Sequence, residues 1–171
     1  MDGNFSLEVS AAVTKKVLAY QYYSLEQHHV LLEGTLLKPN MCRPGEGAKA
    51  PFDPVALARA TVRVLQATLP VAVPGVTFLS GGMGEEDATI SLNEINKVEA
   101  KKPWVLTFSY GRALQQSVLH TWKGKADNVA AAQKELLLRA GANGQAALGT
   151  YKGNAGGALA KASLHVAGYT Y

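Results

Sequence analysis

The sequence predicts an α/β fold in which strands of a parallel sheet alternate with helices. The candidate strands are apolar at both parities, as in parallel strands that are covered on both faces. Each is followed by a segment whose apolar residues recur at helical spacing. Only three convincing strands occur in the 171 residues, whereas an open doubly wound sheet has about five or six. We therefore expect part of the apolar surface of the sheet to remain exposed to water.

The first predicted elements are a helix over residues 7–28 and a strand over residues 30–37. In the helix, apolar residues recur at helical spacing among lysines and glutamines, which is typical of an amphipathic helix. These residues are Val13, Val17 and Tyr20, with Leu18, Tyr22 and Leu25 beside them. The strand segment, VLLEGTLL, is apolar on both parities.

A proline-containing loop separates this strand from the second predicted helix. Asp53 is the predicted N-cap, and Pro54 occupies the first helical position, where a proline is well tolerated. The apolar pattern continues to Leu69, and Pro70 then ends the helix because proline lacks the backbone N–H group.

Two further strand–helix pairs follow. Residues 76–80 form a predicted strand that leads through the turn GGMG into a helix beginning at Glu85. The acidic residues of its first turn suit the positive end of a helix dipole. Residues 104–110 form the third predicted strand, and residues 111–122 form the helix after it.

The last predicted helix runs from about Asn128 to Ala147, with Asp127 as its N-cap. The residues beyond it are rich in glycine and alanine, which is typical of a terminal segment with partial order. We therefore divide the chain into a main portion, residues 1–152, and a tail, residues 153–171.

Composition and charge narrow the partners and the compartment. The formal net charge is +4, and the basic residues are scattered along the chain, so no nucleic-acid partner is predicted. The sequence shows no secretory signal and no apolar run of roughly 18 residues, so we expect no membrane association. Cys42 is the single cysteine, which favours a reducing compartment. The cytoplasm is the expected location, with a plastid as the alternative for a longer precursor.

Lys38 directly follows the first predicted strand, at the end where parallel α/β folds bind ligands. It has the parity of Leu36 and Gly34, and the glycine leaves room on that side of the strand. A desolvated lysine has a lowered pKa, and its neutral amine attacks carbonyl carbons. The alternative is a lysine that reaches water at the strand end or forms a structural ion pair.

Polar and glycine residues also follow the other two strands. Ser80, Gly81 and Gly82 offer a hydroxyl and unobstructed backbone N–H groups before a helix, which suits a phosphate. Arg112, beside Gly111, can bind the same phosphate through two parallel hydrogen bonds. An ordinary turn and a surface arginine are the alternatives. Together with Lys38, these residues predict an enzyme that holds a phosphorylated ketone or aldehyde as an imine.

The motifs LEGTLLKPN, GVTFLSGG and LTFSYGRAL, in this order, resemble the C-terminal half of class I fructose-bisphosphate aldolases. The resemblance begins near residues 13–16 and extends to the terminal tyrosine. Family members are (β/α)8 TIM barrels. The resemblance therefore implies a partial barrel that lacks the first five strands and consists of the last three βα units, a C-terminal helix and the tail.

The resemblance also implies roles for individual residues. Lys38 matches the lysine that forms the Schiff base, and Tyr171 matches the C-terminal tyrosine that assists proton exchange at the enamine. Five residues match the positions that hold the substrate phosphate nearest the imine carbon: Ser80, Gly81, Gly82, Gly111 and Arg112.

The implied reaction is that of a glycolytic and gluconeogenic lyase with a phosphorylated sugar as substrate. Fructose 1,6-bisphosphate is cleaved reversibly to dihydroxyacetone phosphate and glyceraldehyde 3-phosphate. The imine serves as the electron sink, so no metal and no cofactor are expected. Because family members form homotetramers, a homo-oligomer is the implied assembly.

The acid/base glutamates of the family belong to its earlier strands, and nothing in this sequence matches them. General acid/base groups contribute about 10²–10⁴-fold to a proton-transfer step. We therefore expect this chain, as part of a longer barrel, to be weakly active or inactive alone. The alternative is a non-catalytic binding or structural subunit derived from an aldolase. Assembly with a second copy, or with a separate N-terminal half, is a third hypothesis.

Overall fold

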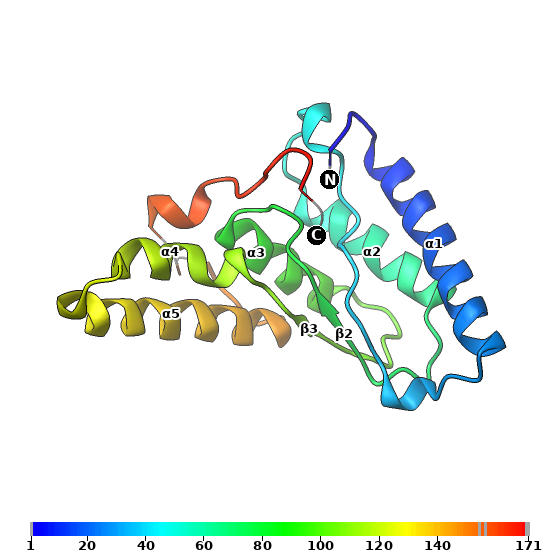
Figure 1. The fold of residues 1–171 in the computed structure, drawn as a ribbon. Coiled ribbons are helices and arrows are strands. Elements are labelled where there is room, and N and C mark those ends of the chain that lie inside the picture. The colour runs from blue at the N-terminus through cyan, green and yellow to red at the C-terminus, as the bar shows by residue number, and fades with distance from the viewer. Residues whose placement is uncertain (1, 154, 156, 170–171) are drawn as a thin grey trace.

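The computed structural model describes residues 2–153, 155 and 157–169 and has an α/β fold (Figure 1). Helices and short parallel strands alternate along the chain, as the sequence predicts. The elements are α1 Leu7–Gln27, β1 Leu36–Leu37, α2 Pro54–Thr68, β2 Gly75–Phe78, α3 Glu85–Lys97, β3 Val105–Phe108, α4 Arg112–Trp122 and α5 Val129–Ala147. Four short 3-10 turns complete the described part, among them η1 Leu32–Gly34, η3 Ala126–Asn128 and η4 Ala158–Lys161.

The three strands form one parallel sheet in the order β1-β2-β3. In its register, Leu37 lies beside Val76, and Val76 lies beside Leu106. Two hydrogen bonds continue the alignment past the strands. Leu79 N donates to Pro39 O at 3.0 Å, and Ser109 N donates to Phe78 O at 2.9 Å. The carboxyl ends of all three strands therefore meet at one edge of the sheet.

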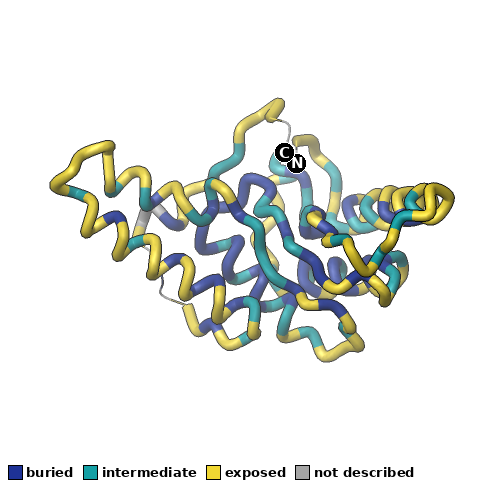
Figure 2. The backbone as a smooth tube through the Cα atoms, turned by 60° about the horizontal axis from the view of Figure 1, so that its bottom comes forward, coloured by how far each residue is buried: buried dark blue, intermediate teal, exposed yellow. Residues whose placement is uncertain are grey.

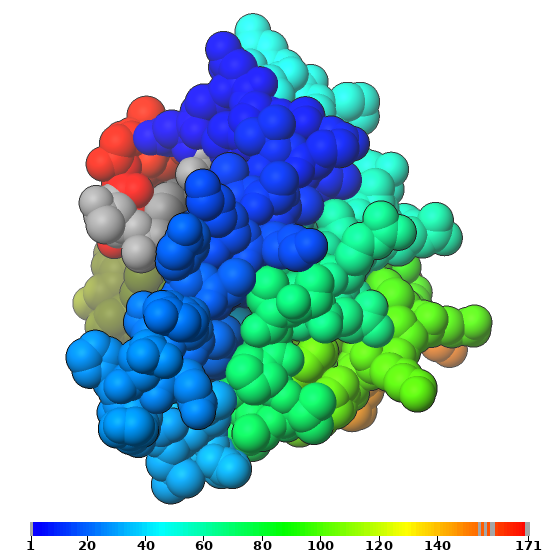
Figure 3. Space-filling model, turned by 90° about the vertical axis from the view of Figure 1, so that its right-hand side faces the viewer, coloured from blue at the N-terminus to red at the C-terminus, as the bar shows by residue number. Residues whose placement is uncertain are grey.

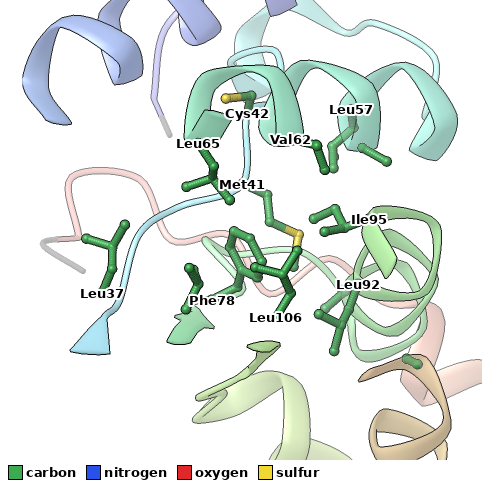
Figure 4. Packing of buried hydrophobic residues seen from close by; sticks show 14 of the residues in the cluster. Leu37, Met41, Cys42, Leu57, Val62, Leu65, Phe78, Leu92, Ile95 and Leu106 are labelled. Atoms are coloured by element: carbon green, nitrogen blue, oxygen red, sulfur yellow. The ribbon is translucent and has the colours of Figure 1, made fainter. Parts of the chain in front are cut away.

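One face of the sheet packs against helices and forms the core (Figure 4). Alternate strand residues point into this core, and α2 and α3 supply apolar side chains opposite them. The labelled members are Leu37, Phe78 and Leu106 from the sheet, Leu57, Val62 and Leu65 from α2, Leu92 and Ile95 from α3, and Met41 and Cys42 from the loop after β1. Each fully buried side chain of this size contributes about 1.5–3 kcal/mol by leaving water.

The opposite face of the sheet is open. Leu36 is 64% exposed and Val105 is 68% exposed, although both lie in strands. Gly75 lies between them in the register, and a Cβ added to it would meet the side chains of both neighbours. The expectation that three strands leave apolar sheet surface in water is therefore confirmed. Figure 2 shows how buried and exposed segments are distributed along the whole backbone.

The prediction of a strand over residues 30–37 is wrong for most of its length. Residues 32–34 form the turn η1, and only Leu36 and Leu37 pair with β2. Thr35 explains the turn, because its backbone N–H and its hydroxyl both donate to Leu32 O, at 3.0 and 2.7 Å. These local hydrogen bonds satisfy polar groups of the segment without a neighbouring strand. The apolar residues at both parities therefore do not indicate burial on both faces here.

The helix predictions hold apart from one N-cap. Asp53 caps α2 as predicted, since its Oδ1 accepts from Ala56 N at 2.9 Å. The prediction that Asp127 is the N-cap of α5 is wrong, because Asp127 lies inside the turn η3 and α5 begins after Asn128. The side chain of Asn128 donates to Trp122 O at 3.0 Å, so it joins the start of α5 to the end of α4 instead of capping the helix.

The first helix, α1, packs on α2, and Figure 3 shows this side of the molecule. It buries Leu18 and Tyr22, whereas the regularly spaced Val13 and Val17 are exposed. The helix prediction is therefore confirmed, and the residues of its apolar pattern divide between buried ones, Leu18 and Tyr22, and exposed ones, such as Val13 and Val17.

The segment near the N-terminus lies beside the tail. Asp2 Oδ1 is 3.0 Å from His165 Nε2, and Asp2 Oδ2 accepts from Gly168 N at 2.7 Å. Figure 1 shows the blue segment before α1 and the red tail segment on the same side of the molecule. Within the described residues, none of the helices has the length and apolar character needed to cross a membrane.

Candidate active site

Lys38 lies at the carboxyl end of β1, on the open face of the sheet. The register of Leu37 with Val76 and Leu106 brings Lys38 level with Thr77 and Thr107. Its side chain is exposed, as is that of Leu36 on the same face. The described residues therefore leave the ammonium group in water. Desolvation, which lowers the pKa of a buried lysine, requires a cover over this face.

The loop after β2 has a backbone that requires glycine at two positions. Gly81 has a φ of 58° and Gly82 a φ of 83°, in the left-handed region that side chains disfavour. Met83 N donates to Ser80 O at 3.2 Å and closes the turn. Both glycines are buried, and Ser80 is half-buried. The turn leads directly into the first turn of α3.

The loop after β3 brings Arg112 close to the loop after β2. Arg112 Nη1 donates to Leu164 O at 2.8 Å, and Leu164 N donates to Gly82 O at 3.0 Å. The guanidinium carbon of Arg112 also lies 4.8 Å from the centre of the Tyr169 ring. Gly111, the N-cap of α4, is exposed, and a Cβ added there would meet no atom within 4 Å. The loops after β2 and β3 therefore both contact Leu164 in the tail.

The predicted catalytic tyrosine, Tyr171, lies outside the described residues. Its role stays a prediction.

Arg43, which the sequence reasoning did not single out, also contacts the glycine loop. Its Nη1 donates to Gly81 O at 3.3 Å, and its Nη2 pairs with Glu46 Oε2 at 2.7 Å. Arg43 lines a cavity of about 340 Å³ together with Gly82 and Asp87. Burial raises the pKa of the Asp87 carboxyl, and the charge of Arg43 opposes that change. A basic residue in a loop gave no local signal of this contact.

A buried ionic cluster lies at the first turn of α3, behind the glycine loop. Arg139, from α5, has no exposed surface, and it donates to Glu86 Oε2 at 3.3 Å. Glu86 Oε1 accepts from the hydroxyl of Tyr151 at 2.7 Å. The pKa of Tyr151 is raised, first by burial and then by this carboxylate. The acidic first turn of α3 therefore has specific partners in addition to the helix dipole that the sequence indicated.

The carboxyl edge of this parallel sheet holds a primary amine, two glycine-containing loops and an arginine. In an α/β protein, this arrangement suits the binding of a phosphorylated carbonyl compound. The family model for fructose-bisphosphate aldolase class-I matches residues 1–171, and the chain belongs to this family. The predicted resemblance is thereby confirmed.

Proteins that are similar to this chain over nearly its whole length are named fructose-bisphosphate aldolase. A fructose-bisphosphate aldolase from Schistosoma mansoni is 58% identical over 170 residues, which are 99% of this chain and 47% of the relative. A cytoplasmic isozyme from Spinacia oleracea is 56% identical over 171 residues, 100% of this chain and 48% of the relative. The chain thus spans about half the length of the curated relatives it matches.

A solved structure shows the same fold. It is a ternary complex of fructose-bisphosphate aldolase from Plasmodium falciparum with TRAP and a small-molecule inhibitor. The TM-score is 0.87 at 53% sequence identity, and the match covers 90% of this chain and 44% of that chain. The prediction of a partial aldolase barrel is therefore confirmed.

Proposed function

We propose that this chain carries the C-terminal half of a class I aldolase site, in which Lys38 forms an imine with a phosphorylated ketone. The reaction of the completed site is the reversible cleavage of fructose 1,6-bisphosphate to dihydroxyacetone phosphate and glyceraldehyde 3-phosphate. One observation carries the proposal: in a chain of this family, Lys38 lies on the open sheet face, at the same edge as the two glycine-containing loops.

The chemistry follows from the residue types. The neutral Nζ of Lys38 attacks the ketone carbon, its two protons leave with the carbonyl oxygen as water, and a proton from an acid group or from solvent then gives the protonated imine. The imine then accepts the electron pair of the carbon–carbon bond that breaks, while the hydroxyl on the departing carbon gives its proton to a base and becomes the aldehyde carbonyl. The phosphate is held by the backbone N–H groups of Gly81, Gly82 and Gly111, the hydroxyl of Ser80 and the guanidinium of Arg112. Tyr171 is the proposed aid to proton exchange.

The chain alone is expected to turn over weakly or not at all. Its Lys38 is exposed, so the described residues do not desolvate the amine. Imine formation and carbon–carbon cleavage also need acid/base groups, each of which contributes about 10²–10⁴-fold. A polypeptide that covers the open face would supply both the desolvation and the missing groups.

Compartment and assembly are proposed on the same family basis. The cytoplasm is the proposed location, supported by the cytoplasmic isozyme of Spinacia oleracea, and a homo-oligomer is the proposed assembly. The division into residues 1–152 and a tail of residues 153–171 stays a prediction.

Borohydride trapping tests the proposed role of Lys38. The purified chain is mixed with dihydroxyacetone phosphate and sodium borohydride, which reduces an imine to a stable secondary amine, and the modified peptides are identified by mass spectrometry. Imine formation should be slow without a cover over the open face, but the proposed phosphate loops should direct the ketone to Lys38, so we expect the main adduct there. Lys38→Arg should abolish it, whereas Lys15→Arg, in the exposed part of α1, should leave it unchanged. No adduct, or adducts spread over many lysines, would favour the non-catalytic alternative.

A further inference from the structure

A single carboxylate joins the two helices that follow the proposed phosphate loops. Glu85 is the first residue of α3, which begins at the glycine loop, and it is 1% exposed. Its Oε1 accepts hydrogen bonds from both N and Oγ of Ser117 in α4, each at 3.0 Å. The helix that begins at Arg112 is thus tied to the helix that follows Gly82.

Arg139 holds this junction from α5. Its Nη2 donates to Glu85 O at 2.8 Å and to Thr89 Oγ1 at 2.7 Å. Its Nη1 donates to Ala155 O at 2.8 Å, at the start of the tail, and to Glu86 Oε2. Figure 1 shows α5 alongside α4, with α3 next to them. One guanidinium therefore contacts α3 at several points and the tail at one.

Arg139 and Glu85 also form a buried ion pair within this cluster. Arg139 Nε lies 3.8 Å from Glu85 Oε2, and neither atom has a hydrogen-bond partner among the described residues. Well-packed apolar residues often replace such buried pairs without loss of stability. The rigid planar fork of an arginine, in contrast, fixes the direction of each partner. Stability alone therefore gives no reason for a charged cluster at this place.

We propose that Arg139 is a positioning residue, which acts with Glu85 to set the spacing between the glycine loop after β2 and the Gly111–Arg112 loop after β3. This inference rests on the proposed function of those loops. A shift of the first turn of α3 relative to α4 changes the gap that the phosphate must fill. A misplacement of about 1 Å in a catalytic arrangement can cost about 10²-fold in rate.

The test separates phosphate positioning from general loss of structure. Arg139→Lys keeps the charge and removes the fork, and Ser117→Ala removes one hydrogen bond to Glu85. The matched control is Thr61→Val, because the Thr61 hydroxyl is equally buried, donates to Leu57 O at 2.8 Å and accepts from Cys42 N at 2.9 Å. For each chain, the ketone concentration that gives half-maximal borohydride adduct on Lys38 is measured with dihydroxyacetone phosphate and with phosphate-free dihydroxyacetone.

We expect Arg139→Lys to raise the half-saturating concentration of dihydroxyacetone phosphate about tenfold or more, and Ser117→Ala to raise it by a smaller factor. The value for phosphate-free dihydroxyacetone should stay unchanged. Inorganic phosphate, added as a competitor, should become a weaker inhibitor in the same two variants and not in Thr61→Val. If Arg139→Lys does not fold, Ser117→Ala decides the outcome.

Two results overturn the inference in different ways. If the unsubstituted chain forms no adduct on Lys38, the proposed function fails, and the inference fails with it. If it forms the adduct but the variants behave like Thr61→Val, or shift both ketones equally, Arg139 has a purely structural role.

Discussion

The two faces of the three-stranded sheet differ in how completely this chain buries them. On one face, Leu37, Val76 and Leu106 form a row with at most 5% exposure beneath helices of the same chain. On the other face, Leu36 and Val105 are mostly exposed, and Lys38 lies beside them. The helix-covered face can stabilise the fold without a partner, whereas the open face carries the proposed chemistry.

This difference predicts that part of a barrel can keep its shape while the proposed activity is lost. Burial of the covered face depends on side chains that the described residues contain. Desolvation of Lys38 depends on side chains that must come from elsewhere, because the described residues leave it in water. Substitutions on the two faces should therefore affect stability and function separately.

The largest expected effect is on the covered face. Phe78 has no exposed surface, so Phe78→Ala should lower the free energy of unfolding by about 3–5 kcal/mol. Val105→Ala, on the open face, should change it by less than about 0.5 kcal/mol. Urea unfolding of both variants measures the contrast. A large loss for Val105→Ala would mean that the open face is buried in solution, for example by self-association.

Alkaline pH should sharpen the comparison, because Tyr110 belongs to the covered face. Its hydroxyl donates to Ala88 O at 3.0 Å, and burial raises the pKa of this hydroxyl well above its ordinary value. At pH values below an ordinary tyrosine pKa of about 10, Tyr110 makes its full contribution to the stability of the fold. Above it, the unfolded chain ionises while the folded chain keeps the proton, so stability falls by about 1.4 kcal/mol per pH unit.

Tyr110→Phe should remove this part of the alkaline slope, although it also removes a buried hydrogen bond. Unfolding by urea at several pH values above about 9 measures the slope of stability against pH. Burial also raises the pKa values of Cys42 and Tyr151, but these groups contribute equally to the unsubstituted chain and to Tyr110→Phe. Tyr20→Phe, on the exposed side of α1, is the control and should keep the original slope. An unchanged slope in Tyr110→Phe would show that Tyr110 ionises normally in the folded chain.

The smallest expected effect is at the start of α2, one of the helices on the covered face. Asp53→Ala removes a side-chain cap and should cost about 1 kcal/mol. Asp127→Ala should cost less than about 0.5 kcal/mol, since Asp127 lies in a turn before α5 and does not cap that helix. Thermal unfolding of the two variants measures the difference. Equal losses would contradict the assignment of the two caps.

Local signals explain which elements the sequence predicts well. Asp53 and Pro54 define the start of α2 by their own backbone preferences, and the structure has them there. Residues 32–34 were predicted as strand because apolar residues at both parities usually indicate burial on both faces. Here the partner layer on one face is not among the described residues, and Thr35 satisfies its backbone and hydroxyl within a turn.

The site is predictable only where its residues lie in motifs. Lys38 and the loop glycines follow strands directly, so their common edge follows from parallel topology. Arg139 and Thr89 are 50 positions apart, and no local pattern in α5 indicates that its arginine is buried. Long-range partners of this kind become visible only when the helices are packed together.

Turnover of fructose 1,6-bisphosphate by the purified chain tests the central claim most directly. The chain should be measured beside a full-length relative, such as the cytoplasmic isozyme of Spinacia oleracea, under identical conditions. We predict turnover at least about 10²-fold lower for this chain, because Lys38 is exposed and the family resemblance matches none of its residues to the acid/base glutamates. Turnover comparable to that of the full-length enzyme would contradict the assignment of half a site to this chain.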